Sequence, residues 1–319
     1  MTSLTRMRYA VQRAIRGLAW PAATGALAAV AAGGLVPTAA AQAATPAYTI
    51  TDLGHLGYPS SSPAGVNTAG QVAGDSYLQA TIPGPCPPKH PCKEHLERAF
   101  SYSGGIMTSL GTLGGNFSYG QAINTAGQVA GYSTLPGLAT THAFLGSGGA
   151  MTDLGTIAGT GSSEAFAVND SGQVAGWSTT AADAQHAFLF SNGKMTDLGA
   201  YNIDTVAEAI NISGVIVGTT YGADSAGNTF NHAFIYTGGQ FRDLNTLIPA
   251  GSGFELTAAT GINSAGQIIA SGYNTTNGQL HAFLLSPPSR RPGAAADTGG
   301  RTRPTPVQPS GDITPAGLP

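Results

Sequence analysis

Residues 163–199 read SEAFAVNDSGQVAGWSTTAADAQHAFLFSNGKMTDLG, and this stretch contains the three motifs that decide the fold. The first motif is Asn-Asp-Ser-Gly at 169–172, the second is His-Ala-Phe at 186–188, and the third is Asp-Leu-Gly at 197–199. Each motif or a near relative occurs five times, and successive Ala-Phe pairs lie 44, 44, 46 and 49 residues apart. This period is typical of a unit of four short antiparallel strands.

The five copies of each motif keep one order along the chain. The first motif begins at Asn67, Asn124, Asn169, Asn211 and Asn263. The second motif ends at Phe100, Phe144, Phe188, Phe234 and Phe283. The third motif begins at Asp52, Ser109, Asp153, Asp197 and Asp243. The first repeat departs from the pattern, because Arg98 stands in place of His and Ser109 in place of Asp.

The composition agrees with a chain of short strands and turns. Only 9% of the 319 residues are charged, 42% are apolar and 46 are glycines. Few Lys and Glu residues disfavour long surface helices, whereas glycine supplies the positive φ that tight turns need. We therefore expect an all-β protein with a packed core.

Two kinds of tight turn are predicted within each repeat. An Asn followed three residues later by Gly suits a type I turn with a left-handed glycine, which joins the first strand to the second. A type I′ turn between the third and fourth strands is predicted at Gly104-Gly105, Gly148-Gly149, Asn192-Gly193 and Gly238-Gly239. Both turns fall at one end of the unit, so the variable loops, including an insertion at 75–97, gather at the other end.

The two ends of the repeat region complement each other. After Phe283 the chain runs into Pro287-Pro288, so the fifth repeat lacks a fourth strand. The segment 47–54 ends in an Asp-Leu-Gly motif and has no strands before it. We expect it to complete the last sheet, which makes residues 44–286 a five-bladed β-propeller of four-stranded antiparallel blades. The alternative is an open stack of repeats, which needs polar capping units.

Repeats with His-Ala-Phe, Asp-Leu-Gly and Asn-x-x-Gly in this order resemble the HAF-repeat family, probable extracellular repeat proteins. The resemblance covers residues 47–286. It implies export and a repeated β unit, and it brings no established activity, cofactor or catalytic residue.

Residues 1–43 are typical of a signal peptide. Four basic residues precede an uncharged, apolar run that ends at a small-residue cleavage pattern at 41–43. These basic residues are Arg6, Arg8, Arg13 and Arg16. Cleavage gives a mature chain from Ala44, secreted or associated with the cell surface and free of the membrane; an uncleaved anchor is the alternative. The Pro-, Gly- and Arg-rich tail at 287–319 is expected to be disordered.

The mature chain is acidic, because removal of the signal leaves 9 basic and 16 acidic residues. This balance disfavours nucleic acid as a partner. Cys86 and Cys92 are expected to form a local disulfide in the exported protein. The alternative is a metal site made by Cys86, His90, Cys92 and His95, but a separation of five residues between the cysteines is unusual for zinc. We therefore expect no metal and no other cofactor.

The repeated His and Asp side chains are expected to be structural. Pairing across the type I′ turn places Asp197 opposite Phe188, so His186 and Asp197 become diagonal neighbours on one face. A bond made once per repeat is more typical of a scaffold than of a site, which is usually unique. The same interpretation covers His142, Asp153, His186, Asp197, His232, Asp243, His281 and Asp52.

The loops at the variable end are the expected binding surface. Aromatic residues near the ends of the second strands approach it, namely Tyr77, Tyr132, Trp177, Tyr221 and Tyr273. Flat rings with polar edges suit a sugar or a peptide, although packing between blades is an alternative role. We therefore expect a monomeric, non-catalytic scaffold that binds a glycan or a protein.

A glycoside hydrolase or lyase is the alternative function. Glu164 and Glu208 are predicted to begin the innermost strands of neighbouring repeats, and two carboxylates at a channel mouth can act as acid and base. The sequence contains no serine or cysteine nucleophile motif and no nucleotide-binding fingerprint. The placement of the two carboxylates separates this alternative from the binding scaffold.

Overall fold

A computed structural model describes residues 49–83, 93–137, 140–199, 203–223 and 227–288. The chain divides into two compact units, Met1–Thr51 and Asp52–Pro319, and every described strand belongs to the second unit. The predicted signal at 1–43, the predicted disulfide between Cys86 and Cys92, and the tail beyond residue 288 lie outside the described residues.

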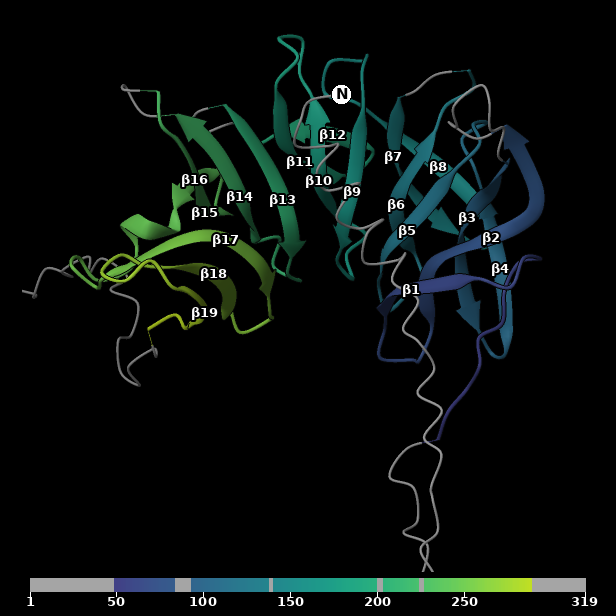
Figure 1. The fold of residues 1–319 in the computed structure, drawn as a ribbon, viewed down its shortest axis with the longest axis horizontal. Helices are drawn as coiled ribbons and strands as arrows, with labels where there is room; N and C mark the ends of the chain where they lie inside the picture. Colours follow the sequence, from purple (N-terminus) through teal and green to yellow (C-terminus); the bar gives the residue numbers. More distant parts are fainter. Residues whose placement is uncertain (1–48, 84–92, 138–139, 200–202, 224–226, 289–319) are drawn as a thin grey trace, which may run out of the picture. The chain divides into compact units, whose positions relative to one another are not determined.

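The described chain is all-β, as predicted, and its strands form five antiparallel sheets in chain order (Figure 1). Sheet 1 contains β1 (Ser61–Val66), β2 (Val72–Pro83), β3 (Lys93–Ser103) and β4 (Ile106–Gly111). Sheet 2 contains β5 (Ser118–Ile123), β6 (Val129–Thr134), β7 (Thr141–Ser147) and β8 (Ala150–Gly155). Sheet 3 contains β9 (Ser163–Val168), β10 (Val174–Thr179), β11 (Gln185–Ser191) and β12 (Lys194–Asp197).

Sheet 4 contains β13 (Asp204–Ile210), β14 (Ile216–Ala223), β15 (Thr229–Thr237) and β16 (Gln240–Asp243). A short 3₁₀ helix, η1 (Leu244–Thr246), follows it. Sheet 5 has three strands, β17 (Phe254–Ile262), β18 (Ile268–Asn274) and β19 (Leu280–Leu285).

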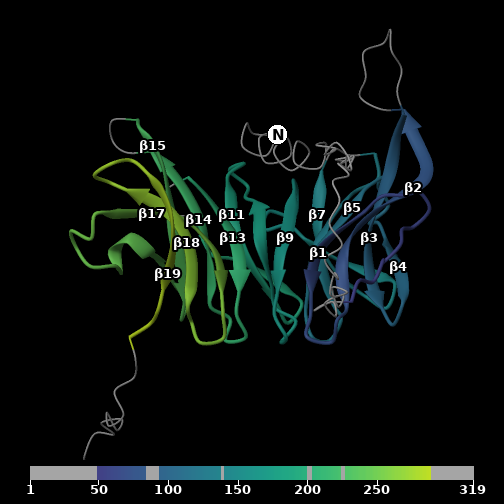
Figure 2. The same ribbon diagram turned by 60° about the horizontal axis from the view of Figure 1, so that its bottom comes forward.

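Both predicted turns are present. In sheet 3 the N–H of Gly172 donates to the carbonyl of Asn169 at 3.0 Å, and the φ of Gly172 is 72°. The second hairpin has positive φ at both Asn192 and Gly193, as a type I′ turn requires. Because both turns lie at one end of each sheet, we call that end the turn face and the opposite end the variable face. Figure 2 shows the hairpin turns of successive sheets along its lower side.

Neighbouring sheets pack face to face, and each joint between two sheets holds one apolar cluster. In the joint of sheets 2 and 3, Ala143 of one His-Ala-Phe motif shares a cluster with Phe188 of the next. Leu154 of the Asp-Leu-Gly motif belongs to the same cluster. Burial of a Leu or Phe side chain contributes about 1.5–3 kcal/mol. The motifs recur because each joint needs the same set of apolar side chains.

The predicted pairing of the N-terminal segment with the fifth repeat is not found. Residues 49–55 form no strand, and within the described residues β19 pairs with β18 alone. Oδ1 of Asp52 instead accepts the N–H of Gly54 at 2.9 Å, in a local turn that precedes β1. Sheet 5 therefore has three strands where four were predicted, and the sheets form a propeller-like array whose closure is not detected.

The predicted insertion at 75–97 is for the most part a longer hairpin. Cross-strand pairing continues from Thr81 opposite His95 to Pro83 opposite Lys93, beyond an irregularity after Tyr77. The described flanks of this segment, 75–83 and 93–97, are therefore strands where a loop was predicted, and residues 84–92 lie outside the described residues. In sheet 4, β14 and β15 are also longer than the equivalent strands of sheets 2 and 3.

Candidate functional site

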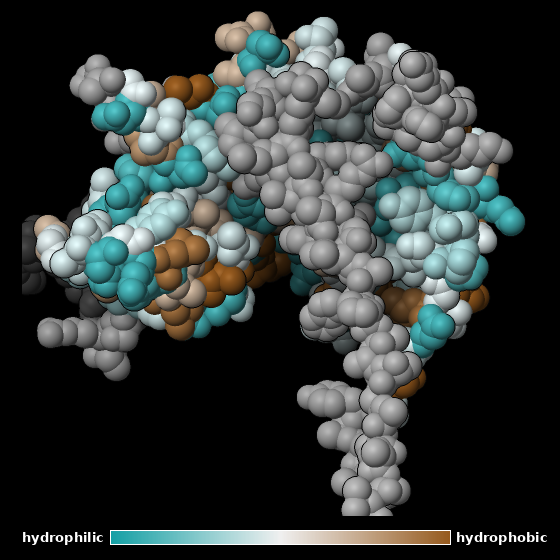
Figure 3. Space-filling view, in the orientation of Figure 1, coloured by the Kyte–Doolittle hydropathy of each residue, from teal (hydrophilic) through white to brown (hydrophobic). Residues whose placement is uncertain are grey.

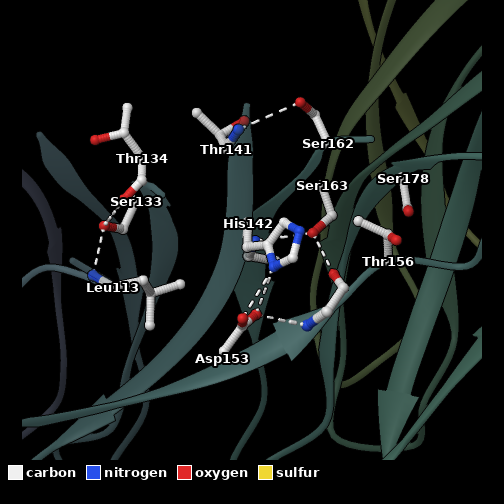
Figure 4. A network of polar contacts seen from close by, with 12 residues as sticks. Leu113, Ser133, Thr134, Thr141, His142, Asp153, Thr156, Ser162, Ser163 and Ser178 are labelled. Carbon is white, nitrogen blue, oxygen red and sulfur yellow. Dashed lines mark hydrogen bonds and ion pairs between the residues drawn. The ribbon is translucent and has the colours of Figure 1, made fainter. Parts of the chain in front are cut away.

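The repeated His and Asp side chains meet as expected in sheet 2. Nδ1 of His142 lies 2.9 Å from both carboxylate oxygens of Asp153 (Figure 4). Oδ1 of Asp153 also accepts the N–H of Gly155 at 2.7 Å. One carboxylate thus orients a side chain of the third strand and stabilises the turn after the fourth strand.

Sheets 3 and 4 repeat this contact. Nδ1 of His186 lies 2.9 Å from Oδ1 of Asp197, and Nδ1 of His232 lies 2.6 Å from Oδ2 of Asp243. Nε2 of His232 also lies 3.5 Å from Oε1 of Glu255 in sheet 5. His232 therefore contacts the aspartate of its own sheet and also a glutamate of the next sheet, across the joint of sheets 4 and 5.

The fourth predicted pair, His281 with Asp52, is not formed within the described residues. The ring centroid of His281 lies 6.1 Å from that of Phe254 and 6.2 Å from that of Phe283. The physical reason is that β19 has no fourth strand beside it to carry an aspartate.

Sheet 1 lacks the His–Asp pair but keeps the turn. Oγ of Ser109 accepts the N–H of Gly111 at 3.2 Å, the bond that an aspartate makes in the other repeats. Nη1 of Arg98 donates to the carbonyl of Asn116 at 2.6 Å, and burial lowers the pKa of this guanidinium. The turn, more than the histidine contact, is the shared requirement of the repeats.

A hydroxyl at the start of the first strand joins neighbouring sheets. Oγ of Ser163 accepts the N–H of Ala143 at 2.9 Å and donates to the carbonyl of Gly155 (Figure 4). The equivalent bonds at the joints of sheets 1 and 2 and of sheets 3 and 4 are made by Ser118 and Thr205. The joint of sheets 4 and 5 is different: Asn245, which follows β16, donates from Nδ2 to the carbonyl of Leu256 at 2.9 Å and accepts the N–H of Leu256 at 2.7 Å.

The asparagines of the five turns form a ladder from sheet to sheet. Nδ2 of Asn124 donates to the carbonyl of Asn169 at 3.0 Å, and Nδ2 of Asn169 donates to the carbonyl of Asn211 at 2.9 Å. The remaining bonds run from Asn67 to Asn124 at 2.8 Å and from Asn211 to Asn263 at 3.2 Å. In each turn Oδ1 also accepts the N–H four residues later. Aspartate cannot supply the Nδ2 donor.

Sequence reasoning missed this ladder, because it assigned the asparagine to the turn alone. The signal that could have found it is a glutamine four residues after the asparagine in four repeats. The Oε1 of this glutamine accepts an Nδ2 proton at 2.7 to 2.9 Å, at Gln71, Gln128, Gln173 and Gln267. A buried amide with this many partners is a structural element of the joint.

Two of the five aromatic residues predicted at the binding surface are buried. Tyr132 and Trp177 are each 6% exposed, and the ring of Tyr132 lies 5.0 Å from that of Tyr119. Tyr132 follows Gly131, which pairs with Phe144, and Trp177 follows Gly176, which pairs with Phe188. The structure therefore corrects the prediction for these two side chains, which pack within the protein and do not form an exposed surface.

The other three predicted aromatics share a different position, two residues nearer the variable face. Tyr77, Tyr221 and Tyr273 each stand three residues after the residue opposite the phenylalanine of the second motif. Each is also paired across the ladder with a carboxylate, in the pairs Tyr77–Glu97, Tyr221–Asp204 and Tyr273–Glu255. Directly paired residues point to the same face of a sheet. The structure thus places a tyrosine at one position in sheets 1, 4 and 5. Its partner is a carboxylate of the first strand in sheets 4 and 5, and in sheet 1 it is Glu97 of the third strand, which is 5% exposed.

Sheet 1 adds an aromatic cluster that the sequence analysis did not find. The ring of Tyr58 stacks on that of His95 with centroids 3.8 Å apart, and it meets Tyr77 edge-on at 6.4 Å. The N–H of Tyr58 donates to the carbonyl of Tyr77 at 3.2 Å, which fixes the main chain beneath the ring. Tyr58 is 40% exposed, and no other repeat has an equivalent residue stacked in this way among the described residues.

The two glutamates of the enzyme alternative do not occupy equivalent positions. Glu164 pairs with Trp177 in β9, where its equivalent in sheet 4 is Val206, opposite Thr219. Glu208 stands in the bulge between Ala207 and Ala209, near the middle of β13. Glu164 is the second residue of β9, as predicted, but Glu208 is not at the start of β13. The prediction for Glu208 was wrong because the bulge was not visible from spacing.

Within the described ranges no group of three or more His, Cys, Asp or Glu side chains could hold a metal ion. The metal alternative at Cys86, His90 and Cys92 lies outside those ranges. Nδ1 of His95 lies 2.9 Å from the carbonyl of Leu78. As far as the chain is described, it contains no helix with the length and hydropathy of a membrane span.

No protein-family model and no curated protein matches this chain. Among solved structures, it is similar to dipeptidyl peptidase 4 of Porphyromonas gingivalis, with a TM-score of 0.37 and 11% identity. The match covers 68% of this chain and 36% of that chain, so the chain spans about a third of the length of its neighbour.

Proposed function

We propose that this chain is an exported, non-catalytic repeat scaffold of the HAF-repeat type, which binds a glycan or a protein through its variable face. The observation that carries the proposal is the set of three tyrosines at one position near that face, two of which pair with a carboxylate of the first strand, Tyr221 with Asp204 and Tyr273 with Glu255. The polar side chains common to the repeats are engaged in bonds of the fold. Binding sites of repeat scaffolds are usually formed by residues that differ between repeats.

The chemistry of these pairs supports a sugar or a cationic peptide as ligand. A tyrosine ring stacks on the apolar face of a sugar or on a planar side chain, while a carboxylate accepts hydrogen bonds from hydroxyl or ammonium groups. The described β region is acidic, and residues 44–286 hold 5 basic and 14 acidic residues. We therefore expect a neutral or cationic ligand, because a region with an excess of acidic residues repels polyanions.

Tyr58 is the best-placed single ring for stacking. One face of its ring packs on His95, its main chain is held by Tyr77, and the side chain is 40% exposed. A ring that is already oriented loses little conformational entropy when it binds a ligand.

The test is a screen of the secreted protein against neutral, amino and acidic glycans and against basic peptides. For the ligand that binds, Tyr58→Ala and Tyr221→Ala are expected to weaken affinity about tenfold or more. Tyr102→Ala is the matched control, because Tyr102 lies near the turn-face end of β3, opposite Met107. Unchanged affinity in both variable-face variants, or preferential binding of acidic glycans, overturns the proposal.

The proposal includes the route by which the chain leaves the cell. The sequence patterns favour removal of residues 1–43 and a disulfide between Cys86 and Cys92. The proposed mature chain is monomeric. N-terminal sequencing of the secreted protein should begin at Ala44, and alkylation without reductant should leave both cysteines unlabelled. A mature chain that keeps the first 43 residues contradicts this part.

The finer architecture that we propose is a closed five-bladed propeller, with residues 47–54 as the fourth strand of sheet 5. Two features of the described residues support it. One edge of β19 has no paired strand among them, and the Asp-Leu-Gly motif at 52–54 precedes β1 with no described sheet before it. Closure would remove the exposed strand edge, which is a liability in an open array.

A further inference from the structure

The first three joints between sheets share one pattern of donors and acceptors, and the joint of sheets 4 and 5 keeps its asparagine bond. The sheet that comes first in the chain supplies the donors, which are an Asn Nδ2 and, at the first three joints, the N–H of the His-Ala-Phe alanine. The following sheet supplies the acceptors, which are an Asn carbonyl and a Ser or Thr hydroxyl. Because these donors lie on the earlier sheet and these acceptors on the later one, the last sheet is left with the donors of the pattern and the first sheet with its acceptors.

Sheet 5 carries the donor half. Asn263 is the last asparagine of the ladder, and its Nδ2 bonds to Oε1 of Gln267 but to no carbonyl of another repeat within the described residues. Ala282 is the alanine of the last His-Ala-Phe motif, and it is exposed, whereas the equivalent Ala143 and Ala187 are 0% exposed. The N–H of the equivalent alanine in each of sheets 1 to 3 donates to a hydroxyl of the next sheet.

Sheet 1 carries the acceptor half. The carbonyl of Asn67 receives no asparagine from another sheet in the described part of the chain. Oγ of Ser61 donates to the carbonyl of Gly54 at 2.8 Å, as Ser163 does to Gly155. The connection before sheet 1 therefore already has the form of a joint, with no preceding sheet to complete it.

The apolar side chains show the same two halves. Ile269 is 53% exposed and Leu284 is 63% exposed on the face of sheet 5 that is turned away from sheet 4. Hydrophobic residues gather over this sheet in the lower left of Figure 3, where Figure 1 places β17 to β19. On sheet 1, Val66 is 69% exposed, although its equivalent Val168 packs in a joint. The outer face of sheet 5 and the free face of sheet 1 therefore both expose apolar side chains that a neighbouring sheet buries at the other joints.

We infer that this face of sheet 5 docks on the free face of sheet 1 of the same chain, as a fifth joint of the common pattern. Asn263 donates to the carbonyl of Asn67, the N–H of Ala282 donates to Oγ of Ser61, and Ile269 and Val66 become buried. Ends on one chain meet at an effective concentration of about millimolar, which exceeds that of a second copy in dilute solution. The inference rests on the ring proposed above and is independent of the ligand.

Hydrogen exchange of the secreted, full-length mature protein tests the joint without any variant. If the joint forms, the amide of Ala282 exchanges within about tenfold of the amides of Ala143 and Ala187. Leu284→Asp places a charge in the joint and should raise the exchange rate of Ala282 at least tenfold. Ile106→Asp is the matched control, because Ile106 is 67% exposed but is the first residue of β4, next to the turn at Gly104-Gly105. Exchange of Ala282 at the rate of a free edge in the unmodified protein overturns the inference.

A cysteine pair separates closure within a chain from association between chains. Ser61→Cys with Ala282→Cys is made in a background in which Cys86 and Cys92 are serine. Ser163→Cys with Ala143→Cys is its counterpart at a joint that is present in the structure. Equal oxidation of both pairs to a cross-linked monomer supports the inference. Cross-linked dimers or longer chains from the first pair alone overturn it in favour of a second copy, and neither result depends on whether a ligand binds.

Discussion

The side-chain amide of Asn124 donates a hydrogen bond to the carbonyl oxygen of Asn169 at 3.0 Å, across the joint of sheets 2 and 3. Both residues also build the turns in which they stand. One residue type therefore specifies a hairpin and a contact between hairpins, and substitutions at this position test both.

Asn169→Asp should destabilise the fold by about 1–3 kcal/mol. Asn169 is 5% exposed, and the aspartate loses the donor to Asn211 while it places a carboxylate beside that carbonyl. Asn192→Asp, in an exposed type I′ turn, should change stability by less than about 0.5 kcal/mol. Urea unfolding of both variants measures the difference, and equal stabilities would contradict the ladder.

Gly176→Ala should cost about 2 kcal/mol or more. A Cβ at this position would overlap the carbonyl oxygen of Glu164 in the neighbouring strand. The Phe188 ring stands opposite this glycine, so the strand cannot move away freely. Thermal unfolding compares this variant with Ala182→Gly in the loop between β10 and β11, which is expected to be near neutral. A stable Gly176→Ala protein would show that the strands can separate there.

If the His–Asp contact is structural, Asp197→Ser should keep most of the stability of the fold. Serine keeps an acceptor for the N–H of Gly199, as Ser109 does for Gly111 in sheet 1. Asp197→Ala loses that acceptor and should cost about 0.5–1.5 kcal/mol. Chemical denaturation ranks the two variants, and loss of ligand binding in the serine variant without loss of stability would indicate a functional role instead.

We expect the carboxyl of Asp170 to make the free energy of unfolding depend on pH in the acid range. Its Oδ1 accepts the N–H of Thr125 at 2.9 Å, and this hydrogen bond lowers the pKa of the carboxyl in the folded state. A carboxyl with a lowered folded pKa stabilises the fold above its unfolded pKa, and this contribution is lost as the pH falls below about 4. Asp170→Asn should therefore flatten the fall of unfolding free energy between about pH 4 and pH 2. An unchanged slope would argue against the bond.

The sequence predicted the internal structure of each repeat well, because turns and strand pairing depend on neighbouring residues. Asn-x-x-Gly and Asn192-Gly193 have φ requirements that few other conformations meet. The pairing of Phe188 with Asp197 follows from the two-residue turn alone. These features are local, so spacing was sufficient to place them.

Features that depend on packing between sheets were not predictable in this way. Tyr132 and Tyr273 are both tyrosines near the end of a second strand, yet one is 6% and the other 45% exposed. Their positions differ by two residues in register, and sheet 5 lacks a following sheet to cover its outer face. The bulge at Glu208 and the stacking of Tyr58 on His95 likewise arise from tertiary contacts that sequence spacing does not encode.

The bonds at each joint run between short side chains and the main chain, so most other positions on a sheet are free to vary. Duplication of one unit would bring with it both the donor and the acceptor edges that its new neighbours need. Such a chain can gain or lose units during evolution without redesign of the contacts. The loops at the variable face can meanwhile differ from one sheet to the next, because they take no part in these bonds.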